Sequence, residues 1–124
     1  MKLIISGGRD YHLTARDIMF LDSILGVEEV VEGECRGADL DGKRWAERRG
    51  IPIKPFPAED YGSWPACGPL RNRAMAEYAD AVVLFPGGRG TTSMRVEATR
   101  QGLGIFEPPA ARAGEKQEVK RGEI

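Results

Sequence analysis

The sequence predicts an α/β protein with a Rossmann-like, three-layer α/β/α fold around a five-stranded, mostly parallel sheet. Short apolar runs alternate with helical segments in the order β-α-β-α-β-α-β-α-β, which is typical of a parallel sheet with helices on both faces. Glycine is abundant: it makes up 16 of 124 residues, or about 13%, against an average of about 7% in proteins. Several of these glycines directly follow the apolar runs. We expect the strand order 3-2-1-4-5, which places the first and fourth strands side by side.

Composition and charge limit the class of protein. A chain of 124 residues with 41% hydrophobic and 30% charged residues is typical of one globular domain. The formal net charge of −1 argues against a protein whose main task is to bind nucleic-acid phosphates, which needs a basic surface. Two cysteines, Cys35 and Cys67, are too few for a disulfide framework, and the single histidine, His12, argues against a histidine-based zinc site. No apolar run approaches the ~18 residues of a membrane span, and the N-terminus predicts a strand rather than a signal peptide. We therefore expect a cytoplasmic protein with no metal and no cofactor.

The chain begins with a strand and a capped helix. Residues 3–5 form an apolar run that stops at a Gly-Gly turn, as a buried strand does. Thr14 and Asp17 have the spacing of a capping box, with Asp in place of the usual Glu. A helix is expected to begin there and to end at Gly26.

The second and third strands flank another helix. Residues 30–31 centre the second strand, and Asp39 is in position to cap a helix that ends near residue 49. Residues 51–56 predict a weaker strand whose prolines suit the edge of a sheet. The following segment, residues 57–67, has no periodicity and is longer than a typical connection, so it is a candidate binding loop.

The last strands and helices complete the predicted sheet. Residues 69–79 predict a helix with proline at its first position, and residues 81–85 form the most apolar strand of the chain. One more helix leads to a short strand at residues 103–106. We expect a folded domain at residues 1–107 and a charged C-terminal tail at residues 108–124.

Glycine-rich loops follow the first and fourth strands, which we expect to be neighbours. In such sheets ligands bind beyond the carboxyl ends of the strands, where the strand order reverses. The loops at residues 7–10 and 87–91 would face each other there across one crevice, with the loop at residues 36–39 beside them. Glycine lets backbone N–H groups approach an anion, a helix begins at one of these loops, and arginine binds phosphate with two hydrogen bonds. We therefore expect a phosphate-containing ligand with a sugar attached, a nucleotide or a sugar phosphate.

The residues expected to bind this ligand lie in these loops or beside them. Asp10 and Asp39 are acceptors suited to ribose hydroxyls, and Thr91 and Thr92 offer hydroxyl donors to a phosphate. The candidate binding residues are Gly7, Gly8, Arg9, Asp10, Arg36, Gly37, Asp39, Arg71, Arg73, Gly87, Gly88, Arg89, Gly90, Thr91 and Thr92.

Simpler interpretations stay open for several residues. Gly-Gly pairs are frequently plain turns, Asp39 is also placed to cap a helix, and Arg71 and Arg73 could be solvated residues of a helix surface. Cys35 is a small residue suited to packing. Trp64, in the non-periodic loop, either stacks on a base or covers the site, or else it pins the loop to the core.

Four segments follow one another along the chain: Ser-Gly-Gly-Arg-Asp-Tyr at residues 6–11, Gly-Ala-Asp at 37–39, Gly-Pro-Leu-Arg-Asn-Arg-Ala-Met at 68–75 and Phe-Pro-Gly-Gly-Arg-Gly-Thr at 85–91. Together they resemble the motifs of the YAcAr (YspA, cpYpsA-related) family of the SLOG superfamily. The resemblance covers residues 1–107. It implies a Rossmann-like fold, a nucleotide-related ligand and a homodimer, and it adds Asn72 and Pro86 to the candidate binding residues.

Two other branches of the superfamily imply alternative functions. The LOG proteins, also called lysine decarboxylase-like, are phosphoribohydrolases that cut the base from a nucleoside 5′-monophosphate, and the position of their catalytic glutamate is Met94 here. The resemblance leaves Arg71 (or Arg73) and Glu97, one helical turn beyond Met94, as candidate catalytic residues. The alternative for Glu97 is a carboxylate in an ion pair. DprA-like proteins bind single-stranded DNA, a function against which the near-neutral charge and the lack of an arginine–aromatic stripe argue.

Overall fold

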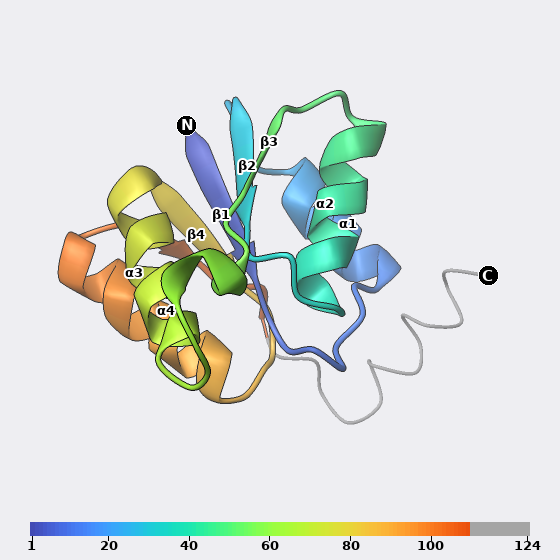
Figure 1. Ribbon diagram of the computed structural model, residues 1–124. Helices are drawn as coiled ribbons and strands as arrows, with labels where there is room; N and C mark the ends of the chain where they lie inside the picture. The colour runs from blue at the N-terminus through green and yellow to red at the C-terminus, as the bar shows by residue number, and fades with distance from the viewer. Residues whose placement is uncertain (110–124) are drawn as a thin grey trace.

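The computed structural model describes residues 1–109, which form a three-layer α/β/α fold (Figure 1). The middle layer is one five-stranded sheet in the order β3-β2-β1-β4-β5, and every neighbouring pair of strands is parallel. The predicted fold class and strand order are confirmed. The strands are β1 (Lys2–Ser6), β2 (Glu29–Glu32), β3 (Ile53–Pro55), β4 (Ala81–Leu84) and β5 (Gly104–Phe106).

Two helices cover each face of the sheet (Figure 1). Successive residues of β1 point to opposite faces, so Leu3 and Ile5 pack with α1 and α2, whereas Ile4 packs with α3 and α4. Because both faces are covered, the strands at the centre of the sheet are apolar along nearly their whole length. The helices are α1 (Ala15–Asp22), α2 (Ala38–Arg48), α3 (Cys67–Tyr78) and α4 (Arg89–Gln101), and a short 3-10 helix, η1 (Ala58–Tyr61), precedes α3.

Helix α1 begins where the capping box predicts and ends earlier than expected. The Thr14 hydroxyl accepts the N–H of Asp17 at 3.1 Å, and the Asp17 carboxylate accepts the N–H of Thr14 at 3.0 Å. The helix ends at Asp22, so the predicted end at Gly26 is wrong. Leu25, which lies four residues after Leu21 at helical spacing, is 85% exposed and does not belong to the core.

The segment without periodicity, residues 57–67, contains η1 and the first residue of α3. Pro69 lies inside the first turn of α3, where its missing N–H removes no helical hydrogen bond. Strand β3 lies at the edge of the sheet and ends at Pro55, as its prolines predict.

Within residues 1–109, no helix is long and apolar enough to cross a membrane. Residues 110–124, which make up most of the expected tail, lie outside the described residues. The division of the chain into a domain and a tail at residue 107 therefore stays a prediction.

Candidate functional site

The loops after β1, β2 and β4 meet at the carboxyl edge of the sheet. The N–H of Gly8 donates to the carbonyl of Pro86 at 2.8 Å, which joins the β1 loop to the β4 loop. The N–H of Ala38 donates to the carbonyl of Gly8 at 3.2 Å, which joins the β1 loop to the start of α2. The structure thus brings together the three loops that the sequence places at this edge.

Several glycines of these loops are needed where one loop packs on another. A Cβ at Gly7 would lie 2.6 Å from the Cβ of Ala38, and a Cβ at Gly87 would lie 3.0 Å from the Cα of Gly8. Gly37 has a φ of +81°, and a Cβ there would lie 2.4 Å from the carbonyl oxygen of Gly8. The two Gly-Gly-Arg loops, which are expected to face each other across a crevice, are in contact where Gly8 and Gly87 meet.

Gly88 and Gly90 differ from these packed glycines. A Cβ at either position would meet no atom within 4 Å, so both face open space at the start of α4. Gly88 is the N-cap of α4, and no side chain caps this helix. The first N–H groups of an α-helix have no partner within the helix, and the helix dipole gives this end a partial positive charge. The start of α4 can therefore accept an anion.

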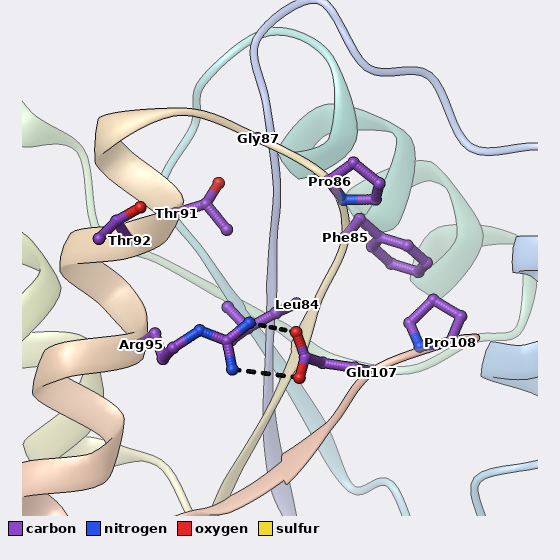
Figure 2. Close-up of a pocket in the computed structure, with 9 residues that line it drawn as sticks. All are labelled: Leu84, Phe85, Pro86, Gly87, Thr91, Thr92, Arg95, Glu107 and Pro108. Atoms are coloured by element: carbon purple, nitrogen blue, oxygen red, sulfur yellow. Dashed lines mark hydrogen bonds and ion pairs between the residues drawn. The ribbon is translucent and has the colours of Figure 1, made fainter. Parts of the chain in front are cut away.

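A pocket of about 290 Å³ lies beside the start of α4 (Figure 2). It opens between the β4 loop, the first two turns of α4 and the residues that follow β5. Arg95 and Glu107 form an ion pair in it, and neither residue is among those predicted from the sequence. Arg95 lies four residues after Thr91, hence on the same face of the helix, and this spacing could have indicated it. The pocket is lined by Leu84, Phe85, Pro86, Gly87, Thr91, Thr92, Arg95, Glu107 and Pro108.

The two threonines at the start of α4 are not equivalent. The Thr92 hydroxyl donates to the carbonyl of Gly88 at 3.2 Å. The Thr91 hydroxyl oxygen is buried and has no hydrogen-bond partner among the described residues. It lies close to Gly87, since a Cβ on that glycine would be 2.1 Å from it. Thr91 therefore lines the pocket, but its hydroxyl oxygen is enclosed beside Gly87.

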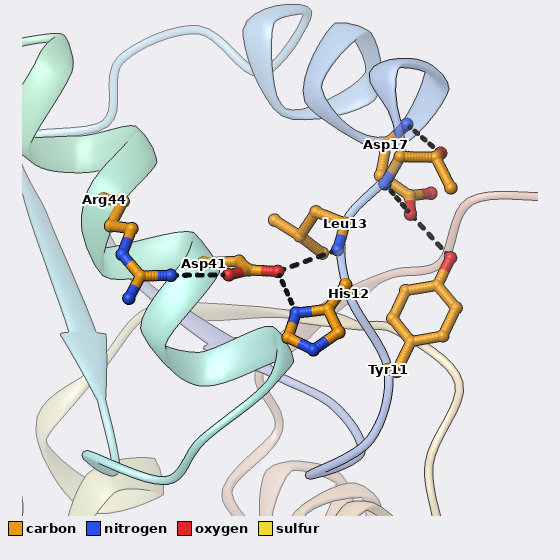
Figure 3. Close-up of polar contacts among 7 residues, drawn as sticks. Tyr11, His12, Leu13, Asp17, Asp41 and Arg44 are labelled. Atoms are coloured by element: carbon orange, nitrogen blue, oxygen red, sulfur yellow. Dashed lines mark hydrogen bonds and ion pairs between the residues drawn. The ribbon is translucent and has the colours of Figure 1, made fainter. Parts of the chain in front are cut away.

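The connection that follows the β1 loop is held to α2 and α1 (Figure 3). The Asp41 carboxylate on α2 accepts the N–H of Leu13 at 3.0 Å. The Tyr11 hydroxyl donates to the Asp17 carboxylate at 2.5 Å, and burial, together with this carboxylate, raises the pKa of the phenol. The ring of Tyr11 stacks on Phe85 with 6.2 Å between the ring centroids. These contacts fix the β1 loop against the pocket wall.

Arg71 and Asn72 are buried in the first turns of α3. The Arg71 guanidinium donates to the carbonyl of Gly33 at 2.7 Å and to the side chain of Asn72 at 2.9 Å. The Asn72 amide donates to the carbonyl of Gly90 and to the hydroxyl of Ser93, both at 3.2 Å. With an exposed fraction of 8%, Arg71 is not a solvated residue of the helix surface, so that interpretation is wrong. The pair positions the β2 loop and the start of α4.

Two carboxylates are buried behind the β2 loop. Gly37, not Asp39, is the N-cap of α2, so the cap interpretation of Asp39 is wrong. The Asp39 carboxylate accepts backbone N–H groups that belong to Gly7, Gly33 and Cys35. Burial raises the pKa of Asp39 to about 6, although the Arg71 guanidinium and these donors oppose the rise. Glu32, which the sequence analysis missed, is fully buried at the end of β2, and burial raises its pKa to about 7.

The accessible charges of the site lie on its outer side. Arg9, Arg36 and Arg89 are exposed, and Arg36 donates to the exposed Asp10 at 3.0 Å. Of the two carboxylates expected at a ribose, Asp10 is therefore the accessible one and Asp39 is buried.

The candidate catalytic Glu97 lies between α3 and α4, outside the pocket lining. Both of its carboxylate oxygens accept from Arg100, at 3.0 and 3.1 Å, and Arg73 lies 3.6 Å away. Met94 is 1% exposed and belongs to the apolar core on this face of the sheet.

Trp64 is 77% exposed, so the interpretation that it pins its loop to the core is wrong.

No group of three or more His, Cys, Asp or Glu side chains among residues 1–109 is arranged to hold a metal ion.

No protein-family model matches the chain, and no curated protein matches its sequence. The structure is similar to the X-ray structure of DNA processing protein A (DprA) from Streptococcus pneumoniae, with a TM-score of 0.71 and 17% sequence identity. The match covers 98% of this chain and 54% of that protein, so this chain spans about half of its length. The two proteins share a fold, which agrees with the expected distant similarity to DprA-like proteins, whereas membership of the YAcAr family stays a prediction.

Proposed function

We propose that this chain binds the phosphate of a nucleotide or ribose phosphate at the start of α4 and in the adjoining pocket, as a binding or sensing module. The observation that carries the proposal is the uncapped N-terminus of α4, where Gly88 and Gly90 face open space beside the pocket. Backbone N–H groups and the positive end of the helix dipole make such a helix end suited to bind phosphate.

Exposed arginines supply the positive field that a small anion needs. Arg89 begins α4, and Arg9 lies in the adjoining β1 loop, so both guanidinium groups belong to loops in contact with each other. The net charge of −1 does not conflict with this arrangement, because the positive field is local. Asp10, exposed in the same loop, is the acceptor we assign to a ribose hydroxyl.

Isothermal titration calorimetry with AMP, ADP-ribose, inorganic phosphate and adenosine tests the proposal. We expect the three phosphate-containing compounds to bind and adenosine not to bind. Gly88→Asp places a carboxylate in open space where the phosphate would lie, so the variant should fold and lose binding. Gly50→Asp is the matched control, because a Cβ at Gly50 also meets nothing within 4 Å and aspartate tolerates its left-handed backbone. If no phosphate compound binds, or if Gly88→Asp binds as well as the wild type, the proposal fails.

The phosphoribohydrolase alternative makes a different prediction. It needs Arg71 to hold the substrate and Glu97 to assist cleavage, but the Glu97 carboxylate is held by Arg100 and Arg73. Removal of a positioned acid–base group typically lowers a rate about 10²–10⁴-fold. We therefore expect no free base when nucleoside 5′-monophosphates are incubated with the protein and separated by chromatography. Release of base that Glu97→Gln abolishes would favour the hydrolase instead.

Single-stranded DNA is a second candidate ligand, which the structural similarity to a DNA processing protein favours. The net charge of −1 argues against it, because phosphate contacts along a strand need many cations. We expect no retardation of single-stranded DNA in a gel at low salt. Retardation that falls steeply as salt rises would support the DNA-binding function.

A further inference from the structure

Arg95 and Glu107 meet across the pocket in a bidentate ion pair (Figure 2). One guanidinium nitrogen of Arg95 donates to a carboxylate oxygen of Glu107 at 3.1 Å, and the other nitrogen donates to the second oxygen. This hydrogen bond lowers the pKa of Glu107, so its carboxylate is negatively charged near neutral pH. The pocket thus already contains an anionic group whose two oxygens bind Arg95, the one arginine among the described residues that line it.

The ion pair is easily exchanged for another. The side chain of Arg95 is 47% exposed and that of Glu107 is 46% exposed, and exposed pairs contribute little to stability. A guanidinium binds a phosphate with the same two-pronged geometry with which it binds a carboxylate. A phosphate in the pocket could therefore replace the Glu107 carboxylate on Arg95 without loss of hydrogen bonds at the arginine.

Donors at the start of α4 favour a phosphate over the Glu107 carboxylate. Thr91, one helical turn before Arg95, lines the same pocket, and no side chain caps the first N–H groups of this helix. Arg95 lies six positions, or about 9 Å of helix, after the first residue of α4, and helical side chains lean toward the N-terminus. A phosphate has more acceptor oxygens than a carboxylate, so it can bond to Arg95 and to donors nearer the helix start at the same time.

We propose that Arg95 is the arginine that binds the ligand phosphate in this pocket, and that Glu107 is a built-in competitor which the phosphate displaces. This proposal rests on the proposed function and adds to it a residue and a form of regulation. Any contact that draws Glu107 away from Arg95 raises the affinity for phosphate, and any contact that holds the pair together lowers it.

Calorimetry of AMP, inorganic phosphate and adenosine with three variants tests the proposal. Glu107→Gln removes the competing charge and should tighten AMP and phosphate binding by about two- to fivefold, the range that an exposed ion pair allows. Arg95→Gln should weaken both by about tenfold or more. The double variant should bind like Arg95→Gln, because Glu107 has no arginine to compete for once Arg95 is lost. Adenosine, which lacks phosphate, should bind to none of them.

Matched controls are Glu59→Gln and Arg48→Gln, which make the same changes at exposed positions outside the pocket lining. Thermal denaturation of every variant shows whether the fold is intact. The competitor role is overturned if Glu107→Gln binds AMP no better than the wild type, or if it tightens binding even without Arg95. If the competitor role is overturned in this way but Gly88→Asp still abolishes AMP binding, the proposed function stands. If neither the wild type nor Glu107→Gln binds AMP or phosphate, both proposals fail.

Discussion

Glu32 makes a prediction that can be worked out from the structure. Its side chain is fully buried at the end of β2, where one carboxylate oxygen accepts the N–H of Glu34 at 2.9 Å and the other has no partner among the described residues. Burial is the main cause of its raised pKa, and the negative charges of Glu34 and Asp39 add to the rise. The hydrogen bond from the N–H of Glu34 and the charge of Lys43 oppose it. The folded protein therefore binds the proton of Glu32 more tightly than the unfolded chain does.

The stability effect follows from the two pKa values. A rise from 4.5 to about 7 corresponds to ~3 kcal/mol of free energy of unfolding. Because the folded state binds the proton more tightly than the unfolded state, this contribution is fully present below pH 4.5 and is lost as the pH rises through about 7. Integration over the two titrations gives a loss of about 2–3 kcal/mol between pH 5 and pH 8.

Glu32→Gln tests this reasoning, because glutamine resembles the protonated acid and has no charge to bury. Urea denaturation at several pH values from 5 to 8 gives the free energy of unfolding. We expect the wild type to lose more stability than the variant as the pH rises, and the variant to be the more stable protein at pH 8. The raised pKa of Asp39 changes stability in the same direction, but it does so in both proteins. Glu59→Gln, at an exposed position, is the matched control. Equal pH slopes for the wild type and Glu32→Gln would refute the reasoning.

Three further predictions concern stability and follow from single contacts. Gly37→Ala should lower the free energy of unfolding by about 3 kcal/mol or more in urea denaturation, because it combines a left-handed backbone with a clash against the β1 loop. Gly50→Ala, with φ +69° and no clash, should cost only about 1 kcal/mol, and equal losses would contradict the role of loop packing. Thr14→Ala removes the capping box of α1 and should lower the free energy of unfolding by about 1 kcal/mol, with an unchanged value arguing against the cap. Glu97→Gln weakens ion pairs between two half-exposed arginines, Arg100 and Arg73, and a carboxylate that is 9% exposed, so we expect a loss of about 1–2 kcal/mol and unchanged AMP affinity in calorimetry. A loss of AMP binding in this variant would place Glu97 in the site.

The fold could be predicted because its determinants are local in the sequence. The alternation of apolar runs and helical segments identifies the strands, and short parallel connections leave few possible strand orders. The capping box at Thr14 and Asp17 likewise depends only on residues three apart. The end of α1 was missed because it depends on burial, and the exposure of Leu25 is a property of the whole fold.

The candidate site could be predicted only in part, because side-chain partners come from distant segments. The meeting of the three loops follows from the strand order, which the sequence indicated. The burial of Arg71 depends on the carbonyl of Gly33, which lies 38 residues away in the chain. The role of Glu107 likewise depends on its meeting with Arg95 across the pocket, and no motif near either residue indicates that contact.

A Gly-Gly pair after a strand has two physical explanations that the sequence does not separate. One is a close approach of two loops, and the other is a close approach of a backbone to a ligand. In this protein, a Cβ would collide with a neighbouring loop at Gly87 but with nothing at Gly88, so one pair contains both cases. The packed glycine fixes the β4 loop against the β1 loop, and the next residue begins the open end of α4. A loop held in this way is already ordered before an anion arrives, so binding need not supply the free energy to order it. The glycine excess is therefore explained by loop packing as well as by ligand access, and only Gly88 and Gly90 bear directly on the proposed phosphate site.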